Sequence, residues 1–499
     1  MQELEKAKIQ KKGRYVMAKF NAKEKVVNRS GYAAYSMSEK EQLVTAVLTT
    51  MFGEGKYYGS TDGDIVRLAA SCAKEDPQFL CNLACYARND AYLRSVSQVL
   101  TCVIAREASE YTREVLQNVI IRADDILEIM ACYKMMYGKP FPNAMKREIA
   151  VQIQKFDEYQ IAKYNGGKRE ITFRDVLRIT HPTPKNEEVE QLFGKVLNDT
   201  LATPYTWETE ISAKGNKKEV WDELIASGRI GYMALLRNLR NIAKSGADMD
   251  AVLEKISDEA AVRKSRQMPF RFYSAYKTLK SGGYMTKEIF RALDQALTAS
   301  AKNMETIEGR TLIAVDVSGS MSWSVSGKST ITCSEIAALM GAMAGSICED
   351  ATVCYFDTSY RVGKAGKYDS ILDTALNNSF SGGGTDMSLP MKYALYEDTA
   401  RDLKAFDRVI YFSDCECNYS FNGKGNTVQS LVDEYRRNYN ADFWVHGVDL
   451  QGYGTQQFCG KNYNLIAGWS DKVLSFISLA EKGFGSMVSE IENYNIRKE

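Results

Sequence analysis

The sequence predicts a chain of two architectures: an α-helical solenoid over residues 1–305 and a doubly wound α/β domain over residues 306–499. In the first part, apolar residues recur at three- and four-residue spacing, which is the period of an amphipathic helix. In the second part, short β-rich apolar runs alternate with helical stretches, which is typical of a parallel sheet covered by helices on both faces. A chain of 499 residues is also longer than one hydrophobic core usually organises.

The charge balance changes at the same boundary. Residues 306–499 contain 17 Lys and Arg against 24 Asp and Glu, a balance of −7, whereas residues 1–305 contain 47 against 39, a balance of +8. The first part is therefore the candidate for binding a polyanion, and the second part would repel one.

Helical segments follow one another through the first part. Apolar residues at helical spacing mark residues 39–52, 77–90, 91–108, 111–138 and 287–304. Asp76 followed by Pro77 predicts a helix start, with the carboxylate as N-cap and proline at the first helical position. Helices in pairs joined by short turns are typical of an α-solenoid of the HEAT type.

The second part contains four predicted strands at residues 311–316, 352–357, 408–414 and 442–449. Helical patterns lie between them, for example at residues 333–347 and 426–439. Strands that alternate with helices predict parallel pairing. His446 falls inside the fourth strand pattern, where we expect a histidine of the core.

Three loops of the α/β part are rich in polar residues. Because the carboxyl ends of parallel strands converge at one edge of a sheet, we expect these loops to lie close together. The loops bring five oxygen-bearing side chains: Asp316, Ser318, Ser320, Thr385 and Asp414. An all-oxygen set of this kind suits Mg²⁺. Hydroxyls that merely cap turns are the alternative, but turn capping does not require two carboxylates to meet. We expect the neighbouring Asp357, Asp386 and Glu416 to support the loops.

Composition predicts a cytoplasmic protein with reduced thiols. Eleven cysteines are scattered through apolar patterns, and the first 20 residues lack the apolar core of a signal peptide. No run of 18 apolar residues predicts a membrane span. Because His181 and His446 are the only histidines, Cys81 and Cys85 find no obvious partner ligands for zinc.

One predicted helix of the first part carries a basic stripe. In residues 173–180, Phe173, Val176 and Leu177 form the core face. A basic turn and a basic stripe adjoin that face and comprise Lys168, Arg169, Arg174, Arg178 and His181. For this stripe alone, an ordinary solvated helix face is an equally good interpretation.

Two further basic clusters favour RNA. The first lines a predicted helix over residues 232–244 and comprises Arg237, Arg240 and Lys244, opposite a core face of Tyr232, Leu235, Leu236, Leu239 and Ile242. The second comprises Arg263, Lys264, Arg266 and Arg271, interleaved with aromatic residues. Guanidinium groups suit phosphates, and aromatic rings can stack on unpaired bases. Together the clusters predict an RNA or single-strand reader.

Five segments carry a resemblance to a known family. TFRDVLRITHPTP, LATPYTWETEIS, WDELIASGRIGYMALLRNLRNI and RKSRQMPFRFYSAYKTL occur in the order seen in TROVE modules, and GRTLIAVDVSGSMS then opens a domain similar to von Willebrand A. The chain resembles bacterial or phage relatives of the Ro autoantigen. The loop residues resemble the metal-ion-dependent adhesion site of A domains, D-x-S-x-S…T…D.

The resemblance implies a ring of HEAT-like repeats whose basic outer surface binds small structured Y-like RNA. The central hole would take single-stranded ends of misfolded RNA, in RNA quality control. The residues that match the RNA-contacting segment are Lys168, Arg169, Arg174 and His181. The implied partners include an exoribonuclease such as polynucleotide phosphorylase, with the chain monomeric in a ribonucleoprotein and no membrane involved.

Two other functions compete with RNA binding. In a protein-binding scaffold, the A-like domain would grip an acidic partner through the open position of its metal. A metal-dependent hydrolase acting on RNA would need carboxylates that bridge two ions and a group that generates the nucleophile. The hydroxyl-rich ligand set argues against hydrolysis, so we expect no catalytic residues and no enzyme activity.

Overall fold

A computed structural model describes residues 25–27, 33–49, 60–166, 169–267, 269–301, 304, 306–324, 331–365, 369–377, 382–401, 403–418, 428–451, 455–467, 472–481 and 487–496. Two compact units divide the chain. The A unit comprises Met1–Thr49, Met268–Phe270 and Leu297–Met487, and the helical unit comprises Thr50–Gln267, Arg271–Ala296 and Val488–Glu499.

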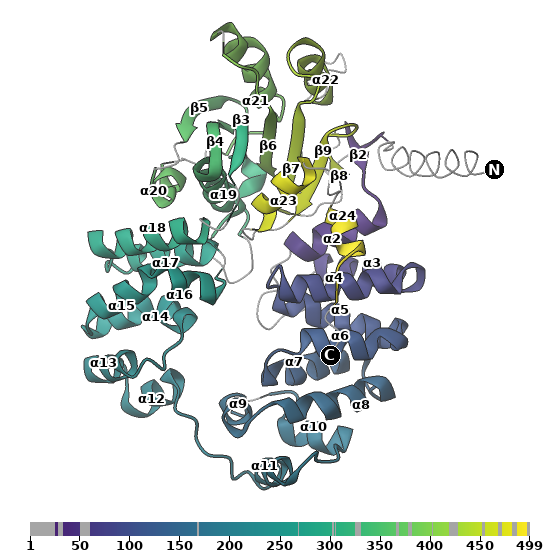
Figure 1. The fold of residues 1–499 in the computed structure, drawn as a ribbon, viewed down its shortest axis with the longest axis vertical. Coiled ribbons are helices and arrows are strands. Elements are labelled where there is room, and N and C mark those ends of the chain that lie inside the picture. The colour runs from purple at the N-terminus through teal and green to yellow at the C-terminus, as the bar shows by residue number, and fades with distance from the viewer. Residues whose placement is uncertain are drawn as a thin grey trace, which may run out of the picture. The chain divides into compact units, whose positions relative to one another are not determined.

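Amphipathic helices build the helical unit, as the periodicity predicts (Figure 1). In chain order they are α3 Ser60–Glu75, α4 Pro77–Asn89, α5 Arg94–Glu107, α6 Thr112–Val119, α7 Ala123–Tyr137, α8 Asn143–Gln152, α9 Glu158–Tyr164, α10 Phe173–Thr180, α11 Glu187–Asn198, α12 Trp207–Lys214, α13 Lys218–Ala226, α14 Tyr232–Ser245, α15 Met249–Ser257, α16 Glu259–Ser265, α17 Pro269–Ser281 and α18 Lys287–Ala301. Helix α4 packs on α5 and α6, α5 packs on α7, and α6 packs on α8. The helices from α4 to α8 thus pack on helices that are close to them in the chain, which is the packing of a solenoid.

Local capping rules decide where α4 begins. The Asp76 side chain accepts a hydrogen bond from the backbone N–H of Phe79 at 3.0 Å, and Pro77 occupies the first helical position. The predicted helix start is therefore confirmed. Its N-cap satisfies an amide that the helix itself leaves unpaired.

Residues near the C-terminus pack within the helical unit. The side-chain amide of Asn82 donates to the carbonyl oxygens of Ile491 and Glu492 at 2.9 and 3.1 Å. The Tyr494 hydroxyl donates to Asp90 at 2.6 Å, and its ring lies edge-on to Tyr86. The predicted boundary between residues 305 and 306 places this segment in the α/β part, whereas the compact helical unit includes Val488–Glu499.

A six-stranded sheet forms the A unit, in the order β5-β4-β3-β6-β7-β9 (Figure 1). The strands are β3 Ile307–Asp316, β4 Cys348–Phe356, β5 Tyr360–Ala365, β6 Arg408–Ser413, β7 Trp444–Asp449 and β9 Tyr463–Ala467. The four predicted strands correspond to β3, β4, β6 and β7, which pair in parallel. The sheet is not wholly parallel as predicted, because β5 pairs antiparallel with β4. Only residues 357–359 join these two strands, which is too short for a parallel crossover.

A second, small sheet joins the N-terminal residues to the A unit. Strand β1 (Lys25–Val27) pairs with β2 (Ala33–Ser36), and β2 pairs with β8 (Thr455–Gln456), both antiparallel. Helix α2 (Glu39–Thr49) follows β2 and packs against β9. Five strands were not predicted from the sequence, and all of them are short or lie at a sheet edge: β1, β2, β5, β8 and β9.

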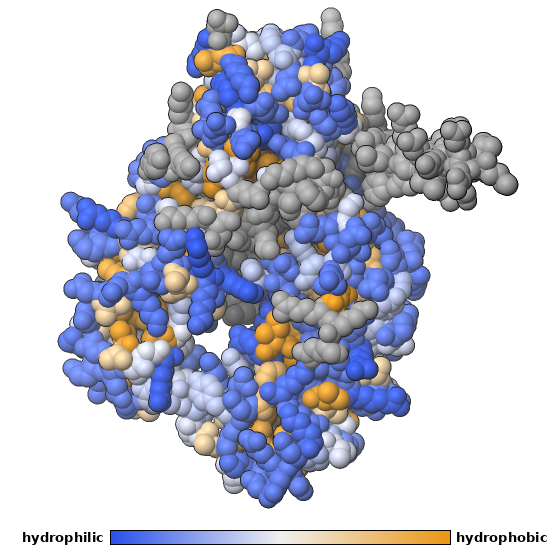
Figure 2. Space-filling view, in the orientation of Figure 1, coloured by the Kyte–Doolittle hydropathy of each residue, from blue (hydrophilic) through white to orange (hydrophobic). Residues whose placement is uncertain are grey.

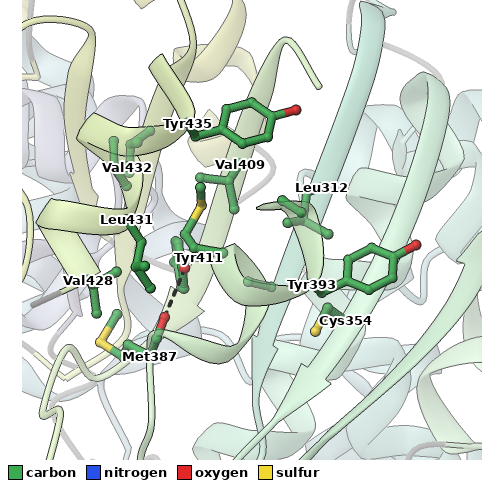
Figure 3. Packing of buried hydrophobic residues seen from close by; sticks show 14 of the residues in the cluster. Leu312, Cys354, Met387, Tyr393, Val409, Tyr411, Val428, Leu431, Val432 and Tyr435 are labelled. Atoms are coloured by element: carbon green, nitrogen blue, oxygen red, sulfur yellow. Dashed lines mark hydrogen bonds between the residues drawn. The ribbon is translucent and has the colours of Figure 1, made fainter. Parts of the chain in front are cut away.

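The two faces of the large sheet pack against different helices because side chains alternate along a strand. Leu312 and Tyr411 lie on the face covered by α21 (Leu389–Lys392), the turn Tyr393–Asp398 and α22 (Val428–Asn438). Figure 3 shows this core, in which the Tyr411 hydroxyl donates to the Met387 carbonyl oxygen at 2.9 Å.

Helix α19 (Cys333–Ile347) covers the other face so closely that a Cβ on Gly341 would lie 2.6 Å from Val315. Helix α20 (Ile371–Leu376) packs on α19, and α23 (Lys472–Glu481) packs on β7 and β9.

Predicted core residues are buried in both units. Phe173, Val176 and Leu177 are buried on α10, as are Tyr232, Leu235, Leu236, Leu239 and Ile242 on α14. His446 is fully buried in β7, where its Nε2 lies 2.9 Å from the carboxylate of Glu481. None of the helices formed by the described residues has the length and hydropathy needed to span a membrane.

Candidate functional site

Loops at the carboxyl end of the large sheet bring together the predicted metal ligands. The loop after β3 carries Asp316, Ser318 and Ser320, and the loop after the neighbouring strand β6 carries Asp414. The glycine-rich loop before Thr385 contacts the first loop directly, since the backbone N–H of Gly319 donates to the Gly383 carbonyl oxygen at 2.8 Å.

Glycine is required where these loops touch. A Cβ on Gly319 would lie 3.0 Å from the Gly382 carbonyl oxygen, and one on Gly383 would lie 2.7 Å from an Asp357 carboxylate oxygen. Side chains at these positions would separate the loops and move Thr385 away from the first loop.

Hydrogen bonds fix the candidate ligands in place. Asp316 accepts from the backbone N–H of Ser318 at 2.9 Å and from the Ser413 hydroxyl at 2.6 Å. The hydroxyls of Ser318 and Ser320 lie 3.1 Å apart. Asp414 accepts from the backbone N–H of Glu416 at 3.1 Å through one of its two carboxylate oxygens.

Two negative charges are buried at this site. Asp316 is 0% exposed and Asp414 is 1% exposed, and no basic side chain among the described residues forms an ion pair with either. Burial, followed by the charge of Asp414, raises the pKa of Asp316 to about 7. Burial also raises the pKa of Asp414, although the hydrogen bond from the backbone N–H of Glu416 opposes the change.

Two buried oxygen atoms of this site have no hydrogen-bond partner among the described residues: Thr385 Oγ1 and Asp414 Oδ2. Buried polar atoms are rarely left unpaired, because desolvation without a partner costs about 1–3 kcal/mol. A divalent cation would supply a partner for both oxygens and would offset the two carboxylate charges. The residues present therefore fit a hard cation with oxygen ligands.

Other residues hold the loops around this site. Asn418 lies beyond the predicted ligands, and its side-chain oxygen accepts from the backbone N–H of Thr385 at 2.6 Å. Asn418 was not predicted from the sequence, because a single amide four residues after Asp414 carries no recognisable pattern. Of the predicted supporting residues, Asp386 donates its backbone N–H to the Asp357 carbonyl oxygen at 2.9 Å, and Glu416 accepts from the Thr455 hydroxyl at 3.2 Å.

The structure separates the predicted basic residues around α10 into two kinds. Arg169 forms an ion pair with Glu128 at 3.0 Å, so an acidic residue of the same unit already neutralises part of its charge. Arg174 is half-buried, Arg178 and His181 are exposed, and none of these three forms an ion pair with a described residue. Lys168 lies outside the described residues.

The stripe on α14 is exposed. Arg237, Arg240 and Lys244 lie on the face opposite its buried leucines, and none of them forms an ion pair within the part of the chain that the structure describes. The adjacent Asn238 is instead buried, and its side chain donates to the Ala234 carbonyl oxygen at 2.9 Å.

The third cluster differs from its prediction. Arg263 pairs with Glu259 at 2.7 Å, and the Arg266 guanidinium lies 5.6 Å from the centroid of the Tyr92 ring, whereas Lys264 and Arg271 are exposed. The interleaved aromatic residues Phe270, Phe272 and Tyr273 are buried in the core. The prediction that they could stack on unpaired bases is therefore wrong, because they occupy the apolar side of α17.

The TROVE domain family matches this chain over residues 36–203 and 194–317, and the Ro60 vWA domain matches residues 310–455. Telomerase protein component 1 of Rattus norvegicus is 22% identical over 332 residues, which cover 48% of this chain and 13% of that protein. RNA-binding protein RO60 of Deinococcus radiodurans is 31% identical over 186 residues, which cover 34% of this chain and 35% of that protein. The matched region thus spans 13% to 35% of the length of these curated relatives.

A solved structure shares the fold. The crystal structure of the Deinococcus radiodurans RO (RSR) protein matches 89% of this chain and 100% of that chain, with a TM-score of 0.62 and 17% identity. The predicted fold class, helical repeats followed by a von Willebrand A-like domain, is confirmed. Because the TROVE matches together span residues 36–317, more than half of 499 residues, the chain belongs to the TROVE family and carries a Ro60-type vWA domain.

Proposed function

We propose that this chain binds RNA and that the exposed basic face of α14 contacts the phosphate backbone. The observation that carries the proposal is the stripe of Arg237, Arg240 and Lys244, which no described acidic residue neutralises. Residues three and four apart on a helix lie about 5–6 Å from each other, so the three cations form one continuous row. Family membership and a relative named as an RNA-binding protein support the same ligand.

Other helices of the helical unit carry cations as well. Lys264 on α16, Arg271 on α17, and Arg174, Arg178 and His181 around α10 are further candidate contacts. Arg169 and Arg263 are weaker candidates, because a phosphate would have to displace Glu128 or Glu259. Such exposed pairs are worth only about 0.2–1 kcal/mol, so displacement lowers the gain from each contact without preventing it.

Removing two cations of α14 tests the proposal. In Arg237→Gln/Arg240→Gln, the slope of log affinity against log salt is expected to fall by about 1.4–1.8, because each lost phosphate contact releases about 0.7–0.9 fewer counterions. Filter binding at several salt concentrations measures the slope. A matched control is Lys404→Gln/Lys461→Gln, which removes two exposed charges from the acidic A unit. Equal slopes for both variants would contradict a contact at α14.

The finer proposal is that the RNA is a small structured, Y-like non-coding RNA and that single-stranded ends of misfolded RNA bind as well, in RNA quality control. Sequencing the RNA that copurifies with the chain identifies the ligand. We further propose that the chain does not cleave this RNA, since hydroxyls make up most of the candidate metal ligands and a two-metal site would need bridging carboxylates.

A second candidate function rests on the unpaired buried oxygens of Thr385 and Asp414. We propose that Asp316, Ser318, Ser320, Thr385 and Asp414 hold a divalent cation, Mg²⁺ in the first instance. When bound, the cation would supply an electrophilic centre that can take a carboxylate of an acidic protein partner. An exoribonuclease such as polynucleotide phosphorylase is the partner class that the resemblance implies.

Calorimetric titration with Mg²⁺ tests the metal site. Asp316→Ala is expected to abolish binding, and Thr385→Val, which keeps the shape but removes the hydroxyl, to weaken it. Asp442→Asn removes an exposed carboxylate of the same unit and serves as the control. Unaltered Mg²⁺ affinity in Asp316→Ala would show that the cation binds elsewhere.

A further inference from the structure

We infer that Arg122 and Tyr164 form a platform on which one unpaired nucleobase of the bound RNA stacks. Arg122 immediately precedes α7, and Tyr164 is the last residue of α9. The Arg122 guanidinium lies over the Tyr164 ring, with Cζ 4.8 Å from the ring centroid. The inference rests on the proposed RNA binding and names a contact that recognises a base instead of a phosphate.

A buried carboxylate fixes the orientation of the guanidinium plane. Asp124 accepts from Arg122 Nε at 3.0 Å and from Arg122 Nη2 at 3.1 Å, so both hydrogen bonds lie along one edge of the planar group. The same carboxylate lies 2.8 Å from Arg94 Nη2. Asp124 is buried, and its two arginine partners prevent it from turning. The platform is therefore formed before any ligand arrives, which lowers the entropy that binding costs.

One face of the guanidinium remains available. The Tyr164 ring covers one face and Asp124 occupies one edge, yet the Arg122 side chain is 45% exposed. A planar, delocalised cation with an open face stacks well on aromatic rings, including nucleobases. An extended Lys or a mobile Arg would not present such a surface.

The bonding of Arg122 favours a base over a phosphate. Its Nε and Nη2 already donate to Asp124, whose negative charge offsets that of the guanidinium, so a phosphate on the remaining Nη1 side would gain less than one beside an unpaired arginine. Stacking uses the open face and leaves those bonds intact. The exposed cations Arg237 and Arg240 differ in this respect, since no described carboxylate engages them.

The surroundings of the platform suit a single strand. Ile121 is 51% exposed beside Arg122, and Tyr159 is 48% exposed five residues before Tyr164. Figure 2 shows hydrophobic surface among the hydrophilic side chains over α7. Lys163 lies between the two tyrosines, with Nζ 5.7 Å from the Tyr164 ring and 5.9 Å from the Tyr159 ring. Aromatic and apolar faces next to a lysine can contact bases and their phosphates together.

Fluorescence of 2-aminopurine tests the inference. A single-stranded oligouridylate carries 2-aminopurine at one position, and the position is varied until binding to the wild-type chain quenches it. Arg122→Lys keeps the charge but lacks the planar guanidinium, so the quenching of 2-aminopurine is expected to disappear and the RNA affinity to fall at least about fivefold. The slope of log affinity against log salt should stay unchanged, because the charge is kept. Tyr164→Phe should retain the quench, and Tyr164→Ala should lose it.

Two controls keep the result specific. Arg106→Lys alters another arginine that lies over a tyrosine, with Cζ 5.7 Å from the centroid of the Tyr137 ring. No carboxylate among the described residues fixes the orientation of that guanidinium. This variant is expected to bind as the wild type does. Replacing the quenched nucleotide by an abasic linker should make the wild type and Arg122→Lys bind equally. Circular dichroism confirms that each variant is folded.

The outcomes separate the two proposals. If the wild-type chain fails to bind any oligonucleotide or structured RNA, the proposed function fails. If it binds but Arg122→Lys quenches 2-aminopurine at every position as the wild type does, RNA binding stands and the platform is overturned. A platform that instead contacts protein would give the same overturning result, with RNA affinity unaffected by Arg122→Lys and Tyr164→Ala.

Discussion

Asp125→Ala is expected to destabilise the helical unit by about 3–5 kcal/mol, because it removes one partner of a buried charge network. Asp125 is fully buried at the start of α7. It accepts hydrogen bonds from the side chains of Arg88, Arg94 and Gln98 and from the backbone N–H groups of Ile121 and Arg122. Removing it leaves the Arg88 guanidinium, whose side chain is 11% exposed, without its carboxylate partner, leaves Arg94 with Asp124 alone, and removes the acceptor of two backbone amides.

Denaturant unfolding of Asp125→Ala measures the loss. Asp157→Ala removes an exposed N-cap that accepts from the backbone N–H of Gln160 at 2.7 Å, and this control should cost only about 1 kcal/mol. Losses of equal size would mean that Asp125 acts merely as another cap.

Acidification adds a second test of Asp125. Burial alone would raise its pKa, but the charges of Arg94 and Arg88 and the hydrogen bond from Arg122 outweigh burial and lower it. A carboxyl with a lowered folded pKa contributes stability above its unfolded pKa and loses that contribution as pH falls through the folded pKa. The free energies of unfolding of wild type and Asp125→Asn should therefore converge as the pH falls toward the folded pKa of Asp125.

Asp316→Asn is expected to stabilise the A unit in EDTA at pH 8, although it destroys the proposed metal site. Asp316 and Asp414 are both buried and repel each other when no cation lies between them. The uncharged amide removes that repulsion and most of the desolvation penalty. Since the pKa of Asp316 rises to about 7 from an ordinary value of 3.8, and each pKa unit corresponds to about 1.4 kcal/mol, the gain is at most about 4 kcal/mol.

The pH dependence of this effect has a defined sign. When folding raises the pKa of a carboxyl group, the protein loses folding stability as the pH rises from the unfolded pKa to the folded pKa, here from 3.8 to about 7. In EDTA, wild type is therefore expected to match Asp316→Asn only near or below pH 4 and to fall progressively below it as the pH rises to 8. Saturating Mg²⁺ should reverse the order at pH 8, because binding to the folded state alone adds stability.

Scanning calorimetry with and without Mg²⁺ measures both variants, and the Mg²⁺-dependent transition identifies the A unit. A less stable Asp316→Asn in EDTA at every pH would show that the carboxylate stabilises the fold without metal. In that case its hydrogen bonds from Ser318 and Ser413 would outweigh its charge.

Local patterns were sufficient for much of the fold. The start of α4, the core face of α10 and strands β3, β4, β6 and β7 follow from periodicity and capping, which involve residues close together in the chain. The antiparallel strand β5 was missed because pairing direction depends on connection length, and its edge position leaves a weak apolar pattern.

By itself, the sequence determined the division into helical and α/β parts and the five oxygen-bearing side chains proposed as metal ligands, because both depend on local spacing. Only the tertiary structure decided which charges are already engaged, with Arg169 on Glu128 and Arg122 on Asp124, and which remain exposed on α14. It also decided that Phe272 and Tyr273 are core residues and that Tyr164 supports a guanidinium. The physical reason is that a helical period specifies a face, whereas ion pairs, stacking and unpaired buried oxygens depend on which elements meet across the fold.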